Sequence, residues 1–240
     1  MTTEKTALVT GANKGIGYAI AEGLGRLGWA VGVGARDEGR LAAAVERLRA
    51  GGVNAFPVPL DVTDDASVAA AATLLRERGG LDVLVNNAAV TGGMPQSPTT
   101  VDPQTILRTI DTNVVGVVRV TNALLPLLRR SASPRIVNVS SSVGSLTLQT
   151  RRGGDTGPIS AAYSPSKTLL NAVMIQYAKE LEGTDVLINA ACPGFVATDL
   201  NGHRGTRTVE QGAATPIRLA TLPDGGPTGG FFDDAGEVPW

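Results

Sequence analysis

The fold is decided by residues Thr6–Gly17, which read TALVTGANKGIG. Thr6–Thr10 is a short apolar run typical of a buried strand, and Ile16–Leu27 carries apolar residues at helical spacing. The turn between them holds three glycines: Gly11, Gly15 and Gly17. Glycine lets the backbone approach a pyrophosphate, and the free N–H groups at a helix start attract phosphates. This first strand–helix turn therefore predicts a dinucleotide site, although an ordinary glycine-rich turn would look similar.

Composition excludes several classes of protein. The 240 residues are 42% hydrophobic and 18% charged, with a net charge of −1, which argues against a disordered chain and against a basic nucleic-acid binder. No apolar stretch reaches the 18 residues of a membrane span. The single cysteine, Cys192, and the polar start Met1–Lys5 predict a cytoplasmic protein with no disulfide and no membrane partner.

Strands alternate with helices along the whole sequence. After Thr6–Thr10, strands are expected at Ala30–Gly34, Ala55–Leu60, Leu81–Val85, Arg135–Val139, Val186–Ala190 and Phe231–Phe232. After Ile16–Leu27, helices are expected at Glu38–Ala50, Asp64–Arg78, Pro103–Leu128 and Ala161–Glu182. Such alternation predicts a single α/β domain over residues 1–240, with six or seven mainly parallel strands in a doubly wound, Rossmann-type sheet and helices on both faces.

Three stretches depart from regular alternation. Pro57 and Pro59 lie within the third strand and cannot donate ladder hydrogen bonds, so this strand is expected at a sheet edge. Two irregular segments, at about 145–162 and 195–208, each follow a strand. Ligands of open α/β sheets bind at the carboxyl ends of the strands, so both segments are candidate substrate loops.

The glycine spacing Gly-x-x-x-Gly-x-Gly resembles the cofactor loop of the short-chain dehydrogenase/reductase family. Further stretches match that family in order: Leu60–Val62, Asn86–Ala89, Asn113–Gly116, Ile136–Ser141, Tyr163–Lys167, Asn189–Gly194 and Thr198-Asp199. The resemblance covers essentially the whole chain, and within the family it is strongest to the carbonyl reductases. It implies cofactor contacts at Gly11, Asn13, Lys14, Gly15, Ile16, Gly17, Arg36, Asp61, Val62, Asn87, Ala88, Ala89, Tyr163, Lys167, Pro193, Gly194, Val196 and Thr198.

Tyr163 and Lys167 lie four residues apart and so share one face of a helix. A nearby ammonium favours the phenolate, so Lys167 is expected to lower the phenol's pKa and make Tyr163 a general acid. Alone, such a pair is also typical of a solvated helix face. The resemblance adds that Ser141 stabilises the developing oxyanion, that Lys167 holds the nicotinamide ribose, and that Asn113 positions a water in a proton relay.

Three consecutive serines, 140 to 142, compete for the catalytic role. The family's serine lies three residues before a glycine, and Gly144 then selects Ser141. The 22 residues from Ser141 to Tyr163 exceed the usual spacing and predict an insertion within Gly144–Ala162, which includes Gly153-Gly154. Pro165 fits a helix only if Tyr163 lies in its first turn.

The residues at the end of the second strand indicate whether the cofactor is NAD or NADP. NAD-binding folds place an acidic residue there, whereas this chain has Ala35 followed by Arg36. A guanidinium suits the 2′-phosphate of NADP, and Lys14 could add a second cation, so we expect NADP(H). Asp37 is the counter-argument, since it could bind a ribose hydroxyl, but we favour its interpretation as the cap of the helix that begins at Glu38.

Some residues that could carry chemistry are not expected to have a functional role. His203 is the only histidine and has no companion ligands, so no metal site is expected. Cys192 follows a buried strand and is expected to be inert, and Trp240 could pack in the core or at a subunit contact.

The leading hypothesis is an NADPH-dependent carbonyl reductase acting on a small-molecule ketone or aldehyde. The same residues would serve an alcohol dehydrogenase that runs oxidatively with NAD(P). A regulator that kept the fold and lost the chemistry would be expected to have a broken serine, tyrosine and lysine set, and this set is intact. The sequence does not decide between a monomer and a homo-oligomer.

Overall fold

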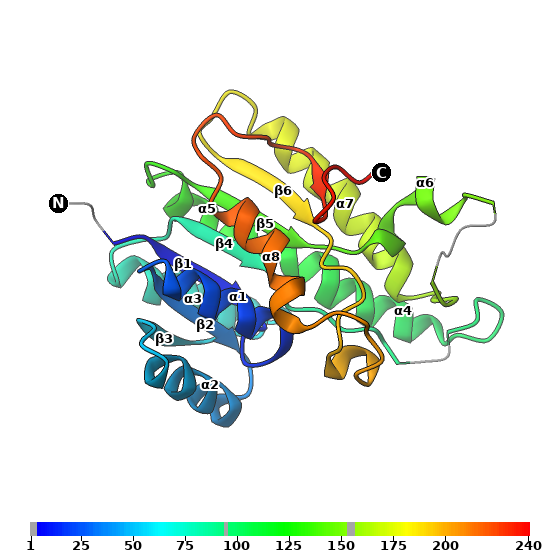
Figure 1. Cartoon of the computed structure of the whole chain (residues 1–240), viewed down its shortest axis with the longest axis horizontal. Coiled ribbons are helices and arrows are strands. Elements are labelled where there is room, and N and C mark those ends of the chain that lie inside the picture. Colours follow the sequence, from blue (N-terminus) through cyan, green and yellow to red (C-terminus); the bar gives the residue numbers. More distant parts are fainter. Residues whose placement is uncertain (1–3, 94–95, 153–156) are drawn as a thin grey trace.

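The computed structural model describes residues 4–93, 96–152 and 157–240. Met1–Thr3 of the polar start and Gly153-Gly154 of the expected insertion lie outside these ranges. Seven parallel strands form one sheet in the order β3-β2-β1-β4-β5-β6-β7 (Figure 1). The strands are β1 (Thr6–Thr10), β2 (Ala30–Ala35), β3 (Ala55–Pro59), β4 (Val83–Asn86), β5 (Arg135–Val139), β6 (Leu187–Ala191) and β7 (Phe231–Phe232).

Helices cover both faces of this sheet, which confirms the predicted three-layer architecture. One face carries α1 (Gly15–Arg26), α2 (Glu38–Ala50) and α8 (Val209–Ala220). The other carries α3 (Asp65–Glu77), α5 (Gly116–Leu128) and α7 (Tyr163–Glu180). Successive side chains of β1 point to opposite faces of the sheet. Leu8 packs on the side of α3, α5 and α7, and Val9 packs on the side of α1, α2 and α8. Shorter helices, α4 (Pro103–Ile110) and α6 (Leu146–Gln149), lie at the carboxyl-end side of the sheet.

The proline-containing strand β3 is at the edge, as predicted. The other edge is β7, where Phe231 is fully buried and stacks on Trp240 with ring centroids 5.5 Å apart. The last residue of the chain therefore packs against the core.

The helical stretch predicted over Pro103–Leu128 is present, but it is not uniform. A π-helical turn, Asp111–Val115, joins α4 to α5. Such turns insert one extra residue per turn and are frequent at functional sites. This one contains Asn113, whose side chain it turns into the protein interior, where the residue is 1% exposed.

Candidate active site

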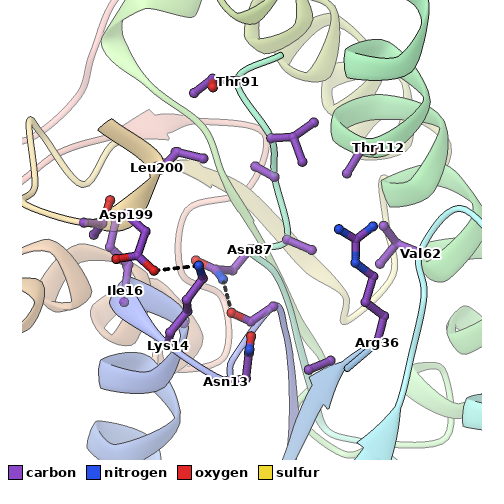
Figure 2. Close-up of a pocket in the computed structure, with 18 of the residues that line it drawn as sticks. Asn13, Lys14, Ile16, Arg36, Val62, Asn87, Thr91, Thr112, Asp199 and Leu200 are labelled. Atoms are coloured by element: carbon purple, nitrogen blue, oxygen red, sulfur yellow. Dashed lines mark hydrogen bonds and ion pairs between the residues drawn. The ribbon is translucent and has the colours of Figure 1, made fainter. Parts of the chain in front are cut away.

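A cleft of about 710 Å³ opens at the carboxyl ends of the first four strands (Figure 2). The order of strands reverses between β1 and β4, and ligands of open α/β sheets bind at such a switch point. Most of the predicted cofactor residues line this cleft: Gly11, Asn13, Lys14, Gly15, Ile16, Gly17, Arg36, Asp61, Val62, Asn87, Ala88, Ala89 and Thr198.

Two glycines of the loop after β1 have steric reasons to be glycine. Gly11 has φ +65°, and a Cβ there would lie 2.9 Å from Cα of Ala88. At Gly17 a Cβ would meet the side-chain nitrogen of Asn87 at 2.4 Å. That amide donates to the carbonyls of Thr10 at 2.8 Å and Gly11 at 3.2 Å, so Asn87 holds the glycine loop against the end of β4.

The glycine loop presents the start of α1 to the cleft, with Gly15, Ile16 and Gly17 as its first residues. Free N–H groups at such a terminus attract phosphates. Lys14 precedes them, but its ammonium is paired with Asp199 at 2.7 Å (Figure 2). Asp199 also pairs with His203 at 2.8 Å, so the pKa of the Asp199 carboxyl is lowered chiefly by its hydrogen bonds to these two side chains. The sequence suggested that Lys14 adds a second free cation beside Arg36. In the structure its charge is instead paired with Asp199.

Arg36 rises from the end of β2 toward Val62 in Figure 2 and is exposed. The neighbouring carboxylate, Asp37, accepts from the backbone N–H of Arg40 at 2.8 Å and caps α2, as predicted. It is therefore engaged in the helix, while Arg36 makes no salt bridge within the described residues.

The segment after β3 forms the next part of the cleft wall. Asp61 accepts from the hydroxyl and the backbone N–H of Thr63, and these two bonds hold the pKa of its carboxyl below the ordinary value. Beside it, a Cβ on Gly116 would lie 2.9 Å from the Val62 side chain. Glycine at that position lets the start of α5 approach the cleft wall closely.

Tyr163 is the first residue of α7, so Pro165 falls in the first turn, where its missing N–H breaks no helical bond. The structure also separates two of the neighbouring serines. Ser140 is 2% exposed and donates to Asn171 at 2.6 Å within the core. Ser141 instead accepts from the N–H of Val143 at 3.4 Å and lies close enough to Tyr163 to favour its phenolate.

Burial raises the pKa of the Tyr163 phenol, a nearby Cys192 thiolate would raise it further, and Ser141 lowers it by less. The expected net lowering of this pKa is therefore wrong for this arrangement, because burial outweighs the groups that favour the phenolate. Lys167 is 3% exposed, donates to the Val139 carbonyl at 2.8 Å, and lies 5.6 Å from the phenol ring centroid. Its own pKa falls to about 8 because its charge is desolvated.

Glycine 144 explains how these groups come together. A Cβ on Gly144 would lie 2.8 Å from the backbone carbonyl carbon of Lys167 and 2.9 Å from its Cβ. Glycine there lets the segment after β5 rest directly on α7. The close approach holds Ser141, three residues earlier, beside Tyr163.

Asn113 ties two parts of the site together. Its side-chain oxygen accepts from Val90 N–H at 2.8 Å, and its nitrogen donates to the Val90 carbonyl and to the Ser166 hydroxyl, each at 2.9 Å. The π-helical turn thereby links the segment after β4 to α7.

The remaining predicted residues lie beyond the cleft lining. Pro193, Gly194 and Val196 follow β6, and Val196 is 3% exposed with its side chain against Gly212 of α8. A Cβ on Gly194, where φ is +75°, would lie 2.7 Å from Cδ of Arg207. The side chain of Val196 thus faces α8 rather than the cleft.

Three parts of the site were not predicted from the sequence. Asp199 was part of a motif but not predicted to pair with Lys14, and Thr91–Gly93 line the cleft without a recognisable motif. Gln96, which contacts the start of α7, had no sequence signal beyond its place between two expected elements. The described residues hold no cluster of three metal-ligating side chains, and no helix among them could cross a bilayer.

Comparisons with known proteins agree with this geometry. The profile of the short chain dehydrogenase family matches residues 5–208. The NADPH carbonyl reductase 1 of Sus scrofa is 37% identical, over 98% of this chain and 94% of its own. That alignment spans 276 positions, more than the 240 residues of this chain, so the relative carries segments that this chain lacks.

Two solved structures are also similar. Salutaridine reductase from Papaver somniferum is 32% identical, with a TM-score of 0.84 over 96% of this chain and 100% of that one. An NADPH-bound carbonyl reductase from chicken fatty liver is 29% identical, with a TM-score of 0.85 over 99% of both chains.

Proposed function

Because the chain belongs to the short chain dehydrogenase family, we propose that it reduces a ketone or an aldehyde to an alcohol with NADPH. The observation that carries the proposal is the grouping of three side chains: Lys167 Nζ lies 5.6 Å from the ring centroid of Tyr163, and Ser141 is close enough to favour the phenolate. Relatives named as NADPH carbonyl reductases support both the reaction and the cofactor.

The cleft suits a nicotinamide dinucleotide with an extra phosphate. Its volume lies within the usual range of ligand pockets, roughly 300–1,000 Å³, and the start of α1 offers N–H groups to a pyrophosphate. Arg36 would bind the 2′-phosphate, since a guanidinium forms bidentate bonds with phosphate oxygens. Asp37 also lines the cleft, but one of its carboxylate oxygens caps α2.

When bound, NADPH supplies the hydride that reduces the carbonyl carbon. The phenol of Tyr163 gives its proton to the carbonyl oxygen as negative charge develops there. The Ser141 hydroxyl donates a hydrogen bond to the same oxygen, and the ammonium of Lys167 stabilises the phenolate that remains. Asn113 links the segment after β4 to α7 through its bonds to Val90 and Ser166. A water positioned by Asn113 would take part in the relay that returns a proton to the Tyr163 phenolate.

Tyr163 starts protonated, as a general acid must, and burial raises the pKa of its phenol further. The same residues would serve the reverse oxidation of an alcohol with NADP⁺.

Exposed apolar side chains gather on the two candidate substrate loops. Leu146 and Ile159 are 60% and 70% exposed on the first, and Phe195 and Leu200 are 52% and 42% exposed on the second. These surfaces support a carbonyl substrate with a sizeable apolar part.

The test is an NADPH-oxidation screen of the purified protein over aldehydes, ketones and quinones. Tyr163→Phe should lower kcat roughly 100-fold or more, because general acid catalysis contributes about 10²–10⁴-fold. NADPH binding, followed by fluorescence titration, should be retained. Wild-type turnover by the phenylalanine variant, or no turnover of the whole panel by the native protein, would overturn the proposal.

A further inference from the structure

The start of α7, which carries Tyr163, lacks a capping side chain of its own. Its N-cap residue is Ala162, whose methyl group cannot accept a hydrogen bond. Pro165 removes one of the four unpaired N–H groups of the first turn. The remaining N–H groups still need partners, and the accuracy with which Tyr163 is held depends on them.

Gln96 supplies partners for two of these groups from a distant part of the chain. Its side-chain oxygen accepts from the N–H of Ala162 at 3.1 Å and of Tyr163 at 3.3 Å, and from the Ser160 hydroxyl at 2.7 Å. Its backbone carbonyl accepts from the N–H of Ala161 at 3.1 Å. Three successive N–H groups leading into α7 therefore end on one residue.

The other end of the same amide holds the wall of the cleft. The side-chain nitrogen of Gln96 donates to the carbonyl of Thr91 and to that of Gly93, the latter at 2.7 Å. Backbone N–H groups only donate and backbone carbonyls only accept, so these partners fix which end of the amide faces α7. Gln96 is 2% exposed, and every polar atom of its side chain is used.

We infer that Gln96 is a positioning residue that couples the cofactor-binding wall at Thr91–Gly93 to the placement of Tyr163. The inference rests on the proposed function, in which Tyr163 is the proton donor. Asn113 makes a parallel link from Val90 to Ser166, so two amides join the segment after β4 to the first turn of α7. A displacement of about 1 Å in a reacting group can slow a reaction 100-fold, and a buried amide with fixed polarity resists such displacement.

Two variants separate the two ends of the amide. Gln96→Met removes both ends and should lower kcat at least tenfold. Gln96→Glu keeps an acceptor toward α7 but sets an oxygen against the carbonyls of Thr91 and Gly93. It should therefore retain more of kcat than the methionine variant while raising KM for NADPH at least fivefold.

The matched control is Gln211→Met. Gln211 accepts from the N–H of Thr208 at 2.9 Å and so caps α8, without lining the cleft. It should lose some thermal stability, though less than Gln96→Met because Gln211 is exposed, and it should keep kcat within about twofold. An equal loss of kcat in both variants, or an unchanged kcat in Gln96→Met, would overturn the inference.

Amide hydrogen exchange gives a readout that does not depend on turnover. In Gln96→Met, exchange at Ala162 and Tyr163 should accelerate at least tenfold, while Ala161 stays protected because its acceptor is the backbone of residue 96. Unchanged exchange at Ala162 and Tyr163 would refute the role of Gln96. Failure of the native protein to turn over any carbonyl would refute the proposed function instead, and the exchange result would still decide whether Gln96 holds Tyr163.

Discussion

The proposed cofactor end of the site, formed by the cleft residues that follow β1 to β4, and its proposed catalytic end, formed by Ser141, Tyr163, Lys167 and the groups that hold them, are built in different ways. At the cofactor end, each of four neighbouring strands contributes the few residues that directly follow it. At the catalytic end, groups far apart in sequence meet through side chains: Gln96 reaches Tyr163 across 67 residues, and Asn113 reaches Ser166 across 53. In the proposed function, short local segments would bind the cofactor phosphates, whereas the placement of Tyr163 depends on a network of side-chain hydrogen bonds.

This difference predicts how each end responds to change. A substitution at the cofactor end should alter cofactor affinity and leave kcat at saturation nearly unchanged. A change at the catalytic end should alter kcat, with cofactor binding affected only through links such as Gln96.

The largest change in cofactor binding is expected from reversing the charge at the end of β2. Arg36→Asp should weaken NADPH binding about 10–100-fold, since hydrogen bonds to charged groups contribute about 1.5–3 kcal/mol, and should change NADH binding little. Titration with both cofactors measures this. Arg26→Asp makes the same charge change on α1 away from the cleft and serves as the control. Equal weakening of NADH and NADPH would show that Arg36 does not read the 2′-phosphate.

The same difference explains what the sequence could predict. The glycine loop, the alternating strands and the edge position of β3 follow from local rules of sterics and hydrogen bonding, and the structure confirms them. Asp37 as a helix cap was likewise a local inference.

Local sequence rules could not predict the contacts between segments that are distant in the sequence. The Lys14–Asp199 pair joins residues 185 apart, and nothing near either residue specifies the partner. The prediction of a lowered pKa for Tyr163 is wrong because the four-residue spacing indicates proximity to Lys167 but not how deeply the phenol is buried. Burial has the largest effect on this pKa. The π-helical turn was missed because Asp111–Val115 carries no breaker residue.

The pH dependence of reduction tests the catalytic end. Lys167 has a pKa of about 8, lowered by burial, so it is charged below that pH and neutral above it. Losing the charge removes its stabilisation of the Tyr163 phenolate, and kcat should fall roughly tenfold between pH 7 and 9. Steady-state rates at saturating substrate and cofactor measure this fall, with the Kd for NADPH measured over the same range as the control. A flat or rising profile would contradict this role for the lysine.

The smallest effect is expected at the Lys14–Asp199 pair, whose two residues both line the cleft. Asp199→Asn releases Lys14 from its carboxylate, which leaves the ammonium free to meet a cofactor phosphate. Both side chains are about half exposed, and exposed pairs contribute little, so NADPH binding should tighten only about two- to fivefold. The gain should shrink as salt is added and vanish when Lys14→Met is combined with Asp199→Asn. Weaker NADPH binding in the single variant would show instead that Asp199 helps to shape the cofactor end, so that a side chain from beyond β6 would belong to the cradle as well.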